Sequence, residues 1–489
     1  MLSNAQHRAW TGKQVGLVGI AVLLLAGFCF GQPLVSLLPK EGPPTTNLLV
    51  SGCGFTPPAA IDIYFDNKNE ALAMANGAGA FSQIVIQAPA SALSGTHWVS
   101  VVDRSGHLAT QERFDVYRNW TEFHTKNMQR YNPYENVLNV DNVGNLRMKG
   151  SYTTGREIRS SPAVVNGVVY IGSFDGYLYA VNARTGALEW SYPTGTLPSS
   201  PAVANGVVYV GSYDSNVYAL DASTGAKVWS YRTNTWVNSS PVVTSGVVYI
   251  GSGDHSVYAL NARTGAKLWS YQAGDVVHSS PAVANGVVYF GSEDHNLYAL
   301  NASTGAKLWS YQAEYHVDSS PAVANGVVYV GAINDGVYAL DAHTGAKLWS
   351  YKTGSVLSSP AVANGVVYVG SHDKNIYALD AGTGTKLWSY QTGGFVESSP
   401  AVANGVVYVG SNDHNVYALN ANTGAKLWSY QTGNVVDSSP AVVNGAVYVG
   451  SWDGNVYAFA LPRGLAEQEA DWKRPDPNKT GEKPVQPKP

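Results

Sequence analysis

A repeat of about forty residues is the feature that most constrains this fold. The tripeptide Ser-Ser-Pro recurs through the chain at a nearly constant spacing. A unit of that size cannot bury an apolar face alone, so successive units must pack on one another in an array. The prolines of the eight copies are Pro162, Pro201, Pro241, Pro281, Pro321, Pro360, Pro400 and Pro440.

Each unit contains four short runs that are typical of strands: SSPAVA, GVVYVGS, NVYALDA and AKLWSY. Asn-Gly, Asp-centred and Thr-Gly turns separate the runs, and glycine there supplies the positive φ that tight hairpins need. Only 13% of residues are charged, whereas 51 are glycine and 31 are tyrosine, which suits short strands joined by turns. Four antiparallel strands per unit predict one blade of a β-propeller.

The blade count follows from the two ends of the array. The last copy stops at NVYAFALP, where Pro462 stands at the start of the missing fourth strand. The stretch LRMKGSYTTG, which begins at Leu146, matches AKLWSYQTG and precedes the first Ser-Ser-Pro. An amino-terminal strand that completes the last blade leaves no free sheet edge. The sequence therefore predicts an all-β fold with an eight-bladed propeller over residues 146–461.

The pattern A-x-[DN]-x-x-T-G-x-x-x-W repeats seven times in register. It resembles the tryptophan-docking motif of PQQ-type eight-bladed propellers, a family that includes quinoprotein alcohol dehydrogenases and a scaffold lipoprotein of outer-membrane protein assembly. We expect each tryptophan to fill the wedge between neighbouring blades. The docking residues are Trp190, Trp229, Trp269, Trp309, Trp349, Trp388 and Trp428. Gly150 stands at the matching position of the closing strand, so the seam between the first and last blades is predicted to be the weakest.

The residues before the propeller predict export and a second domain. Residues 1–40 form a signal or anchor segment with an apolar run at 15–31, which places the rest of the chain outside the cytoplasm, either membrane-anchored or secreted. Residues 45–117 alternate short apolar runs with turns and resemble bacterial immunoglobulin-like modules, which implies a small β-sandwich. Residues 118–145 are expected to be a linker, and the charged, proline-rich residues 462–489 a disordered tail.

Sequence differences between the copies gather on one face of the predicted propeller. The turns between second and third strands and the loops between blades share that face, and nearly all of the variation lies there. Variation on one face of a repeat array commonly marks the binding face. The alternative is drift of polar hairpin tips, in which each turn aspartate simply stabilises its turn. The candidate binding-face residues are Trp236, His255, His278, His295, His316, Asp318, His372, Phe395, Glu397, His414, Asp437 and Trp452.

Three classes of function are compatible with this pattern. The resemblance implies, as one hypothesis, a PQQ-dependent dehydrogenase that holds the quinone beside a calcium ion. The chain has no adjacent cysteine pair, no calcium-loop pattern and no insertion that breaks the repeat, so we expect no enzyme, catalytic residue, cofactor or metal. The favoured interpretation is a non-catalytic exported binding or scaffold protein with a protein or glycan partner on the variable face and membrane attachment through the N-terminal segment. A surface sensor or adhesin is a further alternative, and the net charge of −4 without a basic cluster argues against nucleic acid.

Overall fold

The computed structural model describes residues 32–42, 44–89, 91–92, 95–105, 108–116, 119–123, 125 and 129–462. The predicted apolar segment at 15–31 and the tail from residue 463 lie outside these residues. Among the described residues, none forms a helix with the length and apolar character needed to cross a membrane. The chain divides after Arg118 into two units.

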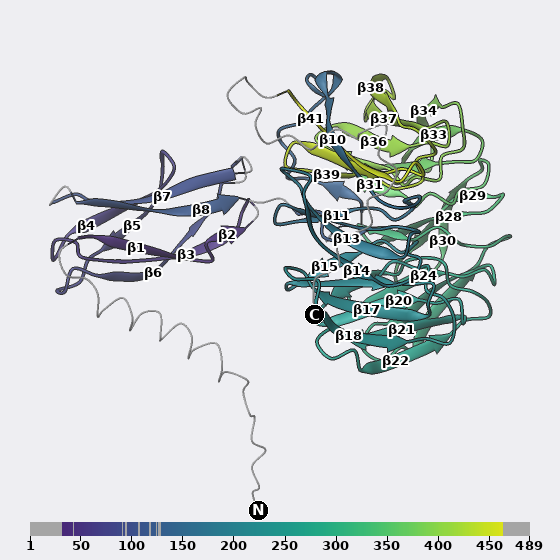
Figure 1. Cartoon of the computed structure of the whole chain (residues 1–489), viewed down its shortest axis with the longest axis horizontal. Coiled ribbons are helices and arrows are strands. Elements are labelled where there is room, and N and C mark those ends of the chain that lie inside the picture. The colour runs from purple at the N-terminus through teal and green to yellow at the C-terminus, as the bar shows by residue number, and fades with distance from the viewer. Residues whose placement is uncertain are drawn as a thin grey trace, which may run out of the picture. The chain divides into compact units, whose positions relative to one another are not determined.

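The first unit contains two sheets, with strand orders β1-β3-β6 and β2-β8-β7-β4-β5 (Figure 1). Alternating side chains such as Leu48, Val50, Ile61 and Ile63 are fully buried and form its core. The immunoglobulin-like character of this unit stays a prediction. Its strands are β1 (Leu34–Leu38), β2 (Glu41–Gly42), β3 (Asn47–Cys53), β4 (Ala60–Phe65), β5 (Lys68–Met74), β6 (Phe81–Gln87), β7 (Gly95–Asp103) and β8 (Ala109–Val116).

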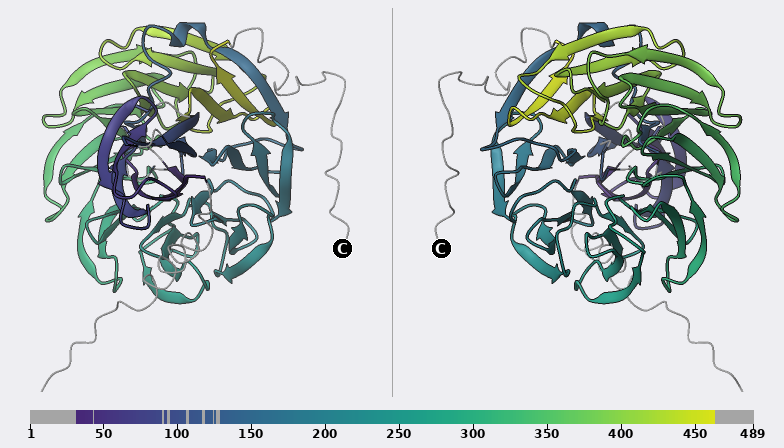
Figure 2. Two further views of the ribbon diagram at one scale, coloured as in Figure 1. Left: turned by 90° about the vertical axis from the view of Figure 1, so that its left-hand side faces the viewer. Right: turned by 90° about the vertical axis from the view of Figure 1, so that its right-hand side faces the viewer.

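The second unit is an eight-bladed propeller, which confirms the predicted fold class. Seen end-on, the blades follow one another around a ring in chain order (Figure 2). Blades 1 to 4 comprise β11 (Ala163–Val165), β12 (Val168–Gly172), β13 (Tyr177–Asn182) and β14 (Leu188–Pro193); β15 (Ala202–Ala204), β16 (Val207–Gly211), β17 (Asn216–Asp221) and β18 (Lys227–Arg232); β19 (Val242–Thr244), β20 (Val247–Gly251), β21 (Ser256–Asn261) and β22 (Lys267–Gln272); and β23 (Ala282–Ala284), β24 (Val287–Gly291), β25 (Asn296–Asn301) and β26 (Lys307–Gln312).

Blades 5 to 8 repeat this order, and blade 8 takes its outer strand from the start of the propeller as predicted. They comprise β27 (Ala322–Ala324), β28 (Val327–Ala332), β29 (Gly336–Asp341) and β30 (Lys347–Tyr351); β31 (Ala361–Ala363), β32 (Val366–Gly370), β33 (Asn375–Asp380) and β34 (Lys386–Gln391); β35 (Ala401–Ala403), β36 (Val406–Gly410), β37 (Asn415–Asn420) and β38 (Lys426–Gln431); and β39 (Ala441–Val443), β40 (Ala446–Gly450), β41 (Asn455–Ala460) and β10 (Arg147–Thr153).

Tryptophans of the outer strands tie neighbouring blades together. The Trp190 indole lies against Gly225 of the next blade and donates its N–H to the carbonyl of Ala222. Gly225 has φ +72°, and a Cβ there would meet the indole at 2.7 Å, so the Thr-Gly turn needs glycine for both reasons. The equivalent indole bonds of the other docking tryptophans lie between 2.9 and 3.1 Å.

Serines close the ring at its centre. The backbone N–H of the second serine in each Ser-Ser-Pro donates to the hydroxyl of the same serine in the next blade, as from Ser161 to Ser200 at 2.9 Å. The last of these bonds runs from Ser439 back to Ser161 at 3.0 Å, so the belt is continuous through all eight blades. The repeated tripeptide therefore has an inter-blade role that its strand pattern alone did not predict.

The segment predicted to be a linker belongs to the propeller. We call residues 119–138 the strap; its described residues include Trp120, Thr121, Arg130 and the short strand β9 (Tyr131–Asn132). Trp120 pairs with Val164 of the innermost strand of blade 1, and β9 pairs in parallel with β35 of blade 7. The segment therefore does more than connect the two units, because its backbone bonds to inner strands of the propeller.

The strap reaches the same valine position in seven blades, which places it at the propeller axis. The valines contacted through main-chain or side-chain hydrogen bonds are Val164, Val203, Val243, Val323, Val362, Val402 and Val442. These valines follow the Ser-Ser-Pro belt toward the Asn-Gly turns. The strap consequently occupies the axis on the opposite side of the belt from the variable face.

Candidate functional site at the channel mouth

The eight residues that precede the Ser-Ser-Pro tripeptides form what we call the mouth ring. Because the serine belt directly after them encircles the axis, these residues lie around the axis on the variable face. The first residues of the turns between second and third strands adjoin the mouth ring. Its members are Arg159, Pro198, Asn238, His278, Asp318, Leu357, Glu397 and Asp437.

An arc of ring side chains runs along one side of the mouth. Phe174 meets Tyr213 edge-on with a centroid distance of 6.2 Å, and Tyr213 meets Trp236 at 5.9 Å. Trp236 then lies 5.0 Å from His278. These residues come from turns and loops of blades 1 to 4, so near-identical blades present a continuous aromatic surface.

A cation and a carboxyl group meet where the ring closes. The Arg159 guanidinium lies 4.0 Å from the centre of the Trp452 ring and 4.8 Å from that of Phe174. Burial, followed by the charge of Glu397, raises the pKa of Asp437 to about 7. Arg159, the Trp452 indole and His372 oppose that rise.

Glu397 and Phe395 form the other side of this region. His372 stacks on Phe395 with a centroid distance of 4.7 Å, and its Nε2 lies 3.1 Å from Oε1 of Glu397. The approach to Glu397 is that of an ion pair without hydrogen-bond alignment. The Phe395 side chain remains 45% exposed, so an apolar ring faces solvent beside these charged groups.

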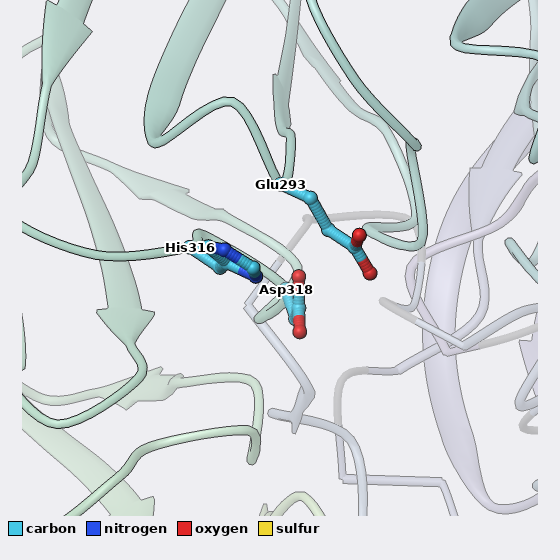
Figure 3. A group of neighbouring side chains, drawn as sticks. All are labelled: Glu293, His316 and Asp318. Atoms are coloured by element: carbon cyan, nitrogen blue, oxygen red, sulfur yellow. The ribbon is translucent and has the colours of Figure 1, made fainter.

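A second group of ionisable side chains joins blades 4 and 5. Glu293, His316 and Asp318 each offer a ligand atom within 4.8 Å of the others (Figure 3). Burial raises the pKa of Asp318, and the coulombic effect of Glu293 adds to it, whereas His278 and His316 lower it. Two carboxyl groups and an imidazole are thus held together with one Asp318 oxygen lacking a hydrogen-bond partner.

The turn aspartates have a structural role in the same region. Asp294 accepts hydrogen bonds from Tyr298, from the backbone of Asn296 and from Gly274 in the loop entering the blade. Burial acts to raise the pKa of Asp294, but these bonds together lower it. In blade 5 the residue at the equivalent sequence position is Asn334. Its neighbour Asp335 accepts the hydrogen bond from the tyrosine instead.

The structure brings together most of the candidate binding-face residues. Trp236, His278, His316 and Asp318 lie in the arc or the Glu293 group, and the His295 ring lies beside that of His316, tilted to it at a centroid distance of 5.0 Å. The other members lie around Asp437 and form a separate cluster, so the mouth has two clusters, the Glu293 group and the Asp437 group. The members of the Asp437 group are His372, Phe395, Glu397, Asp437 and Trp452.

Two candidates stand apart from these groups. His255 and His414 occupy the third turn position with φ of +67° and +73°. His255 lies 3.7 Å from Asp275, outside both clusters. The sequence list also missed Arg159, Phe174, Tyr213 and Glu293, which occupy the same repeat positions as residues it named; a column-by-column comparison of the copies would have found them.

The comparisons with known proteins are consistent with this fold. Residues 142–272, 175–312, 274–359 and 354–482 match the PQQ-type repeat family described as outer membrane protein assembly factor BamB. The chain belongs to this family. The description names a factor of outer-membrane protein assembly, which is consistent with a location outside the cytoplasm.

The proteins to which the chain is similar include quinone dehydrogenases and BamB. The dehydrogenase subunit of the quinone alcohol dehydrogenase of Acetobacter aceti is 38% identical over 77 residues, 15% of this chain and 10% of that protein. The chain thus spans about a tenth of the length of this curated relative. BamB from Moraxella catarrhalis has a TM-score of 0.57 at 21% identity, covering 64% of this chain and 99% of that one. The quinohemoprotein alcohol dehydrogenase from Pseudomonas putida HK5 has a TM-score of 0.63 at 21% identity, covering 76% and 83%.

These relatives correct three predictions made from the sequence. A non-catalytic binding or scaffold protein, the absence of an enzyme and the absence of a cofactor are contradicted, because the curated relatives are quinone alcohol dehydrogenases. The lack of insertions and of a cysteine pair is not decisive against an enzyme, because this ring brings ordinary turn residues together into ionisable and aromatic clusters at the mouth.

Proposed function

We propose that this PQQ-type propeller is a quinone-dependent alcohol oxidoreductase whose reaction takes place at the mouth ring. The raised pKa of Asp437 is the observation that carries the proposal. Its carboxyl group is ionised for about half of the time near neutral pH because its pKa is raised to about 7. A general base is most effective when its pKa lies near the working pH. Export through the N-terminal segment would place this reaction outside the cytoplasm.

The side chains of the mouth suit an oxygen-rich, flat cofactor. Among the described residues, Asn412 Oδ1 is buried without a hydrogen-bond partner. The Asp437 carboxyl group interacts with the Trp452 indole N–H, and His372 Nε2 with Glu397, but neither contact is a well-aligned hydrogen bond. Buried polar atoms normally have well-aligned partners, so this group of side chains favours a ligand that supplies them. A bound quinone would supply the acceptor for the two electrons removed from an alcohol.

The chain's own residues then have separate roles. Asp437 would accept the alcohol proton, since burial stabilises its neutral form. Arg159 would hold an anionic oxygen while its flat guanidinium stays between Phe174 and Trp452. Phe395 and Trp236 offer flat faces against which a ring can pack.

Quinone binding and alcohol oxidation test the proposal separately. We expect PQQ with Ca²⁺ to quench tryptophan fluorescence, and the loaded protein to reduce a dye with primary alcohols. Asp437→Asn should lower the oxidation rate about 10²–10⁴-fold, the usual contribution of a general base, while quinone binding remains. His414→Gln, on the same face but outside both clusters, is the matched control. Failure of the wild-type protein to oxidise any alcohol when loaded, or an unchanged rate in Asp437→Asn, would overturn the proposal.

A further inference from the structure

We propose that Glu293, His316 and Asp318 bind a divalent first-row transition metal. Their ligand atoms lie within 4.8 Å of one another, and they come from two neighbouring blades (Figure 3). Glu293 lies in the turn between β24 and β25, and His316 and Asp318 lie in the loop that leads to β27. The proposal does not rest on the quinone reaction.

The backbone holds these two segments in place. Val317, between the two loop ligands, is 1% exposed and donates its N–H to the carbonyl of Ser292 at 3.2 Å. Glu293 directly follows Ser292. Each of the three ligands is therefore next in sequence to a residue of one inter-blade hydrogen bond, which fixes their relative positions before any ion binds.

A chain of neighbouring side chains orients Glu293. The Asn238 amide nitrogen lies 2.9 Å from Nδ1 of His278, and Nε2 of His278 lies 3.0 Å from Oε1 of Glu293. An amide NH₂ can only donate, so Nδ1 accepts and Nε2 carries the proton that points to Glu293. Such outer contacts fix metal-binding carboxylates in known sites.

The site has unused capacity for a cation. Oδ1 of Asp318 is buried without a hydrogen-bond partner, and the carboxyl group of Glu293 is its neighbour. Two carboxylates at this separation repel each other, and a cation between them removes that repulsion. The ring of His316 also contacts the ring of His295, with a centroid distance of 5.0 Å.

The donor types select the class of metal. Calcium and magnesium prefer sets made of oxygen ligands alone. An imidazole with two carboxylates suits Mn²⁺, Fe²⁺, Co²⁺ or Zn²⁺ and leaves coordination positions for water or substrate. We therefore expect these ions to bind this cluster more tightly than Ca²⁺ does.

Metal titration without quinone tests the site directly. After treatment with a chelator and removal of any affinity tag, the full chain should bind one Co²⁺ or Zn²⁺ by calorimetry, and Co²⁺ should acquire visible ligand-field absorption. His316→Gln, Asp318→Asn and Glu293→Gln should each weaken binding at least about tenfold, the scale of effects around metal sites. Circular dichroism would verify that each variant folds.

Two control variants separate this site from other histidines and from the proposed reaction. His255→Gln removes an imidazole on the same face but outside the cluster, and should bind Co²⁺ as the wild type does. Asp437→Asn should also keep the metal while losing alcohol oxidation. Co²⁺ binding that is absent from the wild type, unchanged in Asp318→Asn, or lost equally in His255→Gln would overturn the metal site.

Discussion

Trp428 donates its indole N–H to the carbonyl oxygen of Leu146, 3.1 Å away and 282 positions earlier in the chain. The other six docking tryptophans each donate to an alanine carbonyl in the turn between the third and fourth strands of the next blade. Blade 8 lacks that turn because its outer strand is β10. The residue just before β10 supplies the missing carbonyl. At the next junction Lys149 donates to Ala183 at 3.2 Å, at the place where the other blades use an indole.

The junctions between neighbouring blades should contribute unequally to stability. Trp388→Ala removes a buried indole and its bond to Ala421, and we expect a loss of about 3–5 kcal/mol in the free energy of unfolding. Lys149→Ala removes a partly exposed hydrogen bond and should cost about 1 kcal/mol. Urea denaturation compares the two variants. Equal losses would contradict the idea that the seam with Gly150 is the weaker junction, as would uniform hydrogen exchange over all blades.

Arg130 should be a major stabilising residue of the strap. It is fully buried, and its hydrogen bonds reach the carbonyls of Phe123, Pro400 and Pro440. Burial lowers its pKa to about 9, yet it remains charged at neutral pH. Arg130→Ala removes the donor that these carbonyls share, and we expect a loss of about 2–5 kcal/mol in denaturant unfolding.

Arg184 provides the control for that experiment. It is exposed in a turn of blade 1, so Arg184→Ala should change stability by no more than about 0.5 kcal/mol. If Arg130→Ala were equally neutral, the strap would make no measurable contribution to closing the ring.

The serine belt predicts a cost for removing a single hydroxyl group. Ser280→Ala leaves the buried N–H of Ser240 without its acceptor, now 2.9 Å away. An unsatisfied buried donor costs about 1–3 kcal/mol, measurable by thermal or chemical unfolding. Ser303→Ala, in an exposed turn, should be close to neutral. A Ser280→Ala protein as stable as the wild type would show that the belt is dispensable.

Asp437 should make stability depend on pH. Its pKa is about 7 in the folded protein against an ordinary value of 3.8, so the folded state binds the proton more tightly than the unfolded state. Stability from this group is therefore present below about pH 4 and falls as the pH rises to about 7, by at most about 4 kcal/mol. Unfolding wild type and Asp437→Asn at several pH values isolates this difference. Parallel pH profiles for the two proteins would contradict the raised pKa.

The repeat made the propeller predictable because each copy contains the same strand-forming and turn-forming residues. LRMKGSYTTG even indicated which strand would close the ring. The strap was not predictable, because it bonds largely through backbone groups to the valines of other segments and has no periodic pattern of its own. Its aromatic and polar residues, such as Trp120 and Arg130, therefore looked like those of a linker.

The sequence predicted which repeat positions lie on the candidate binding face, but not which side chains contact one another there. His295 and His414 share one turn position and both have positive φ, yet of the two only His295 has an imidazole neighbour among the described residues, His316. That difference depends on the residue in the following loop of each blade. Sequence comparison alone does not show which loops approach which turns.

The mouth ring also determines how an asymmetric molecule can be oriented. Eight identical subsites around an axis would accept a small ligand in eight equivalent orientations, none of which is selected. Here near-identical blades carry arginine, proline, asparagine, histidine, leucine, glutamate and two aspartates at that one position. A nearly eightfold-symmetric scaffold thus presents a surface with no rotational symmetry. A ligand turned about the axis meets different side chains in each orientation, so one orientation can be favoured over the others.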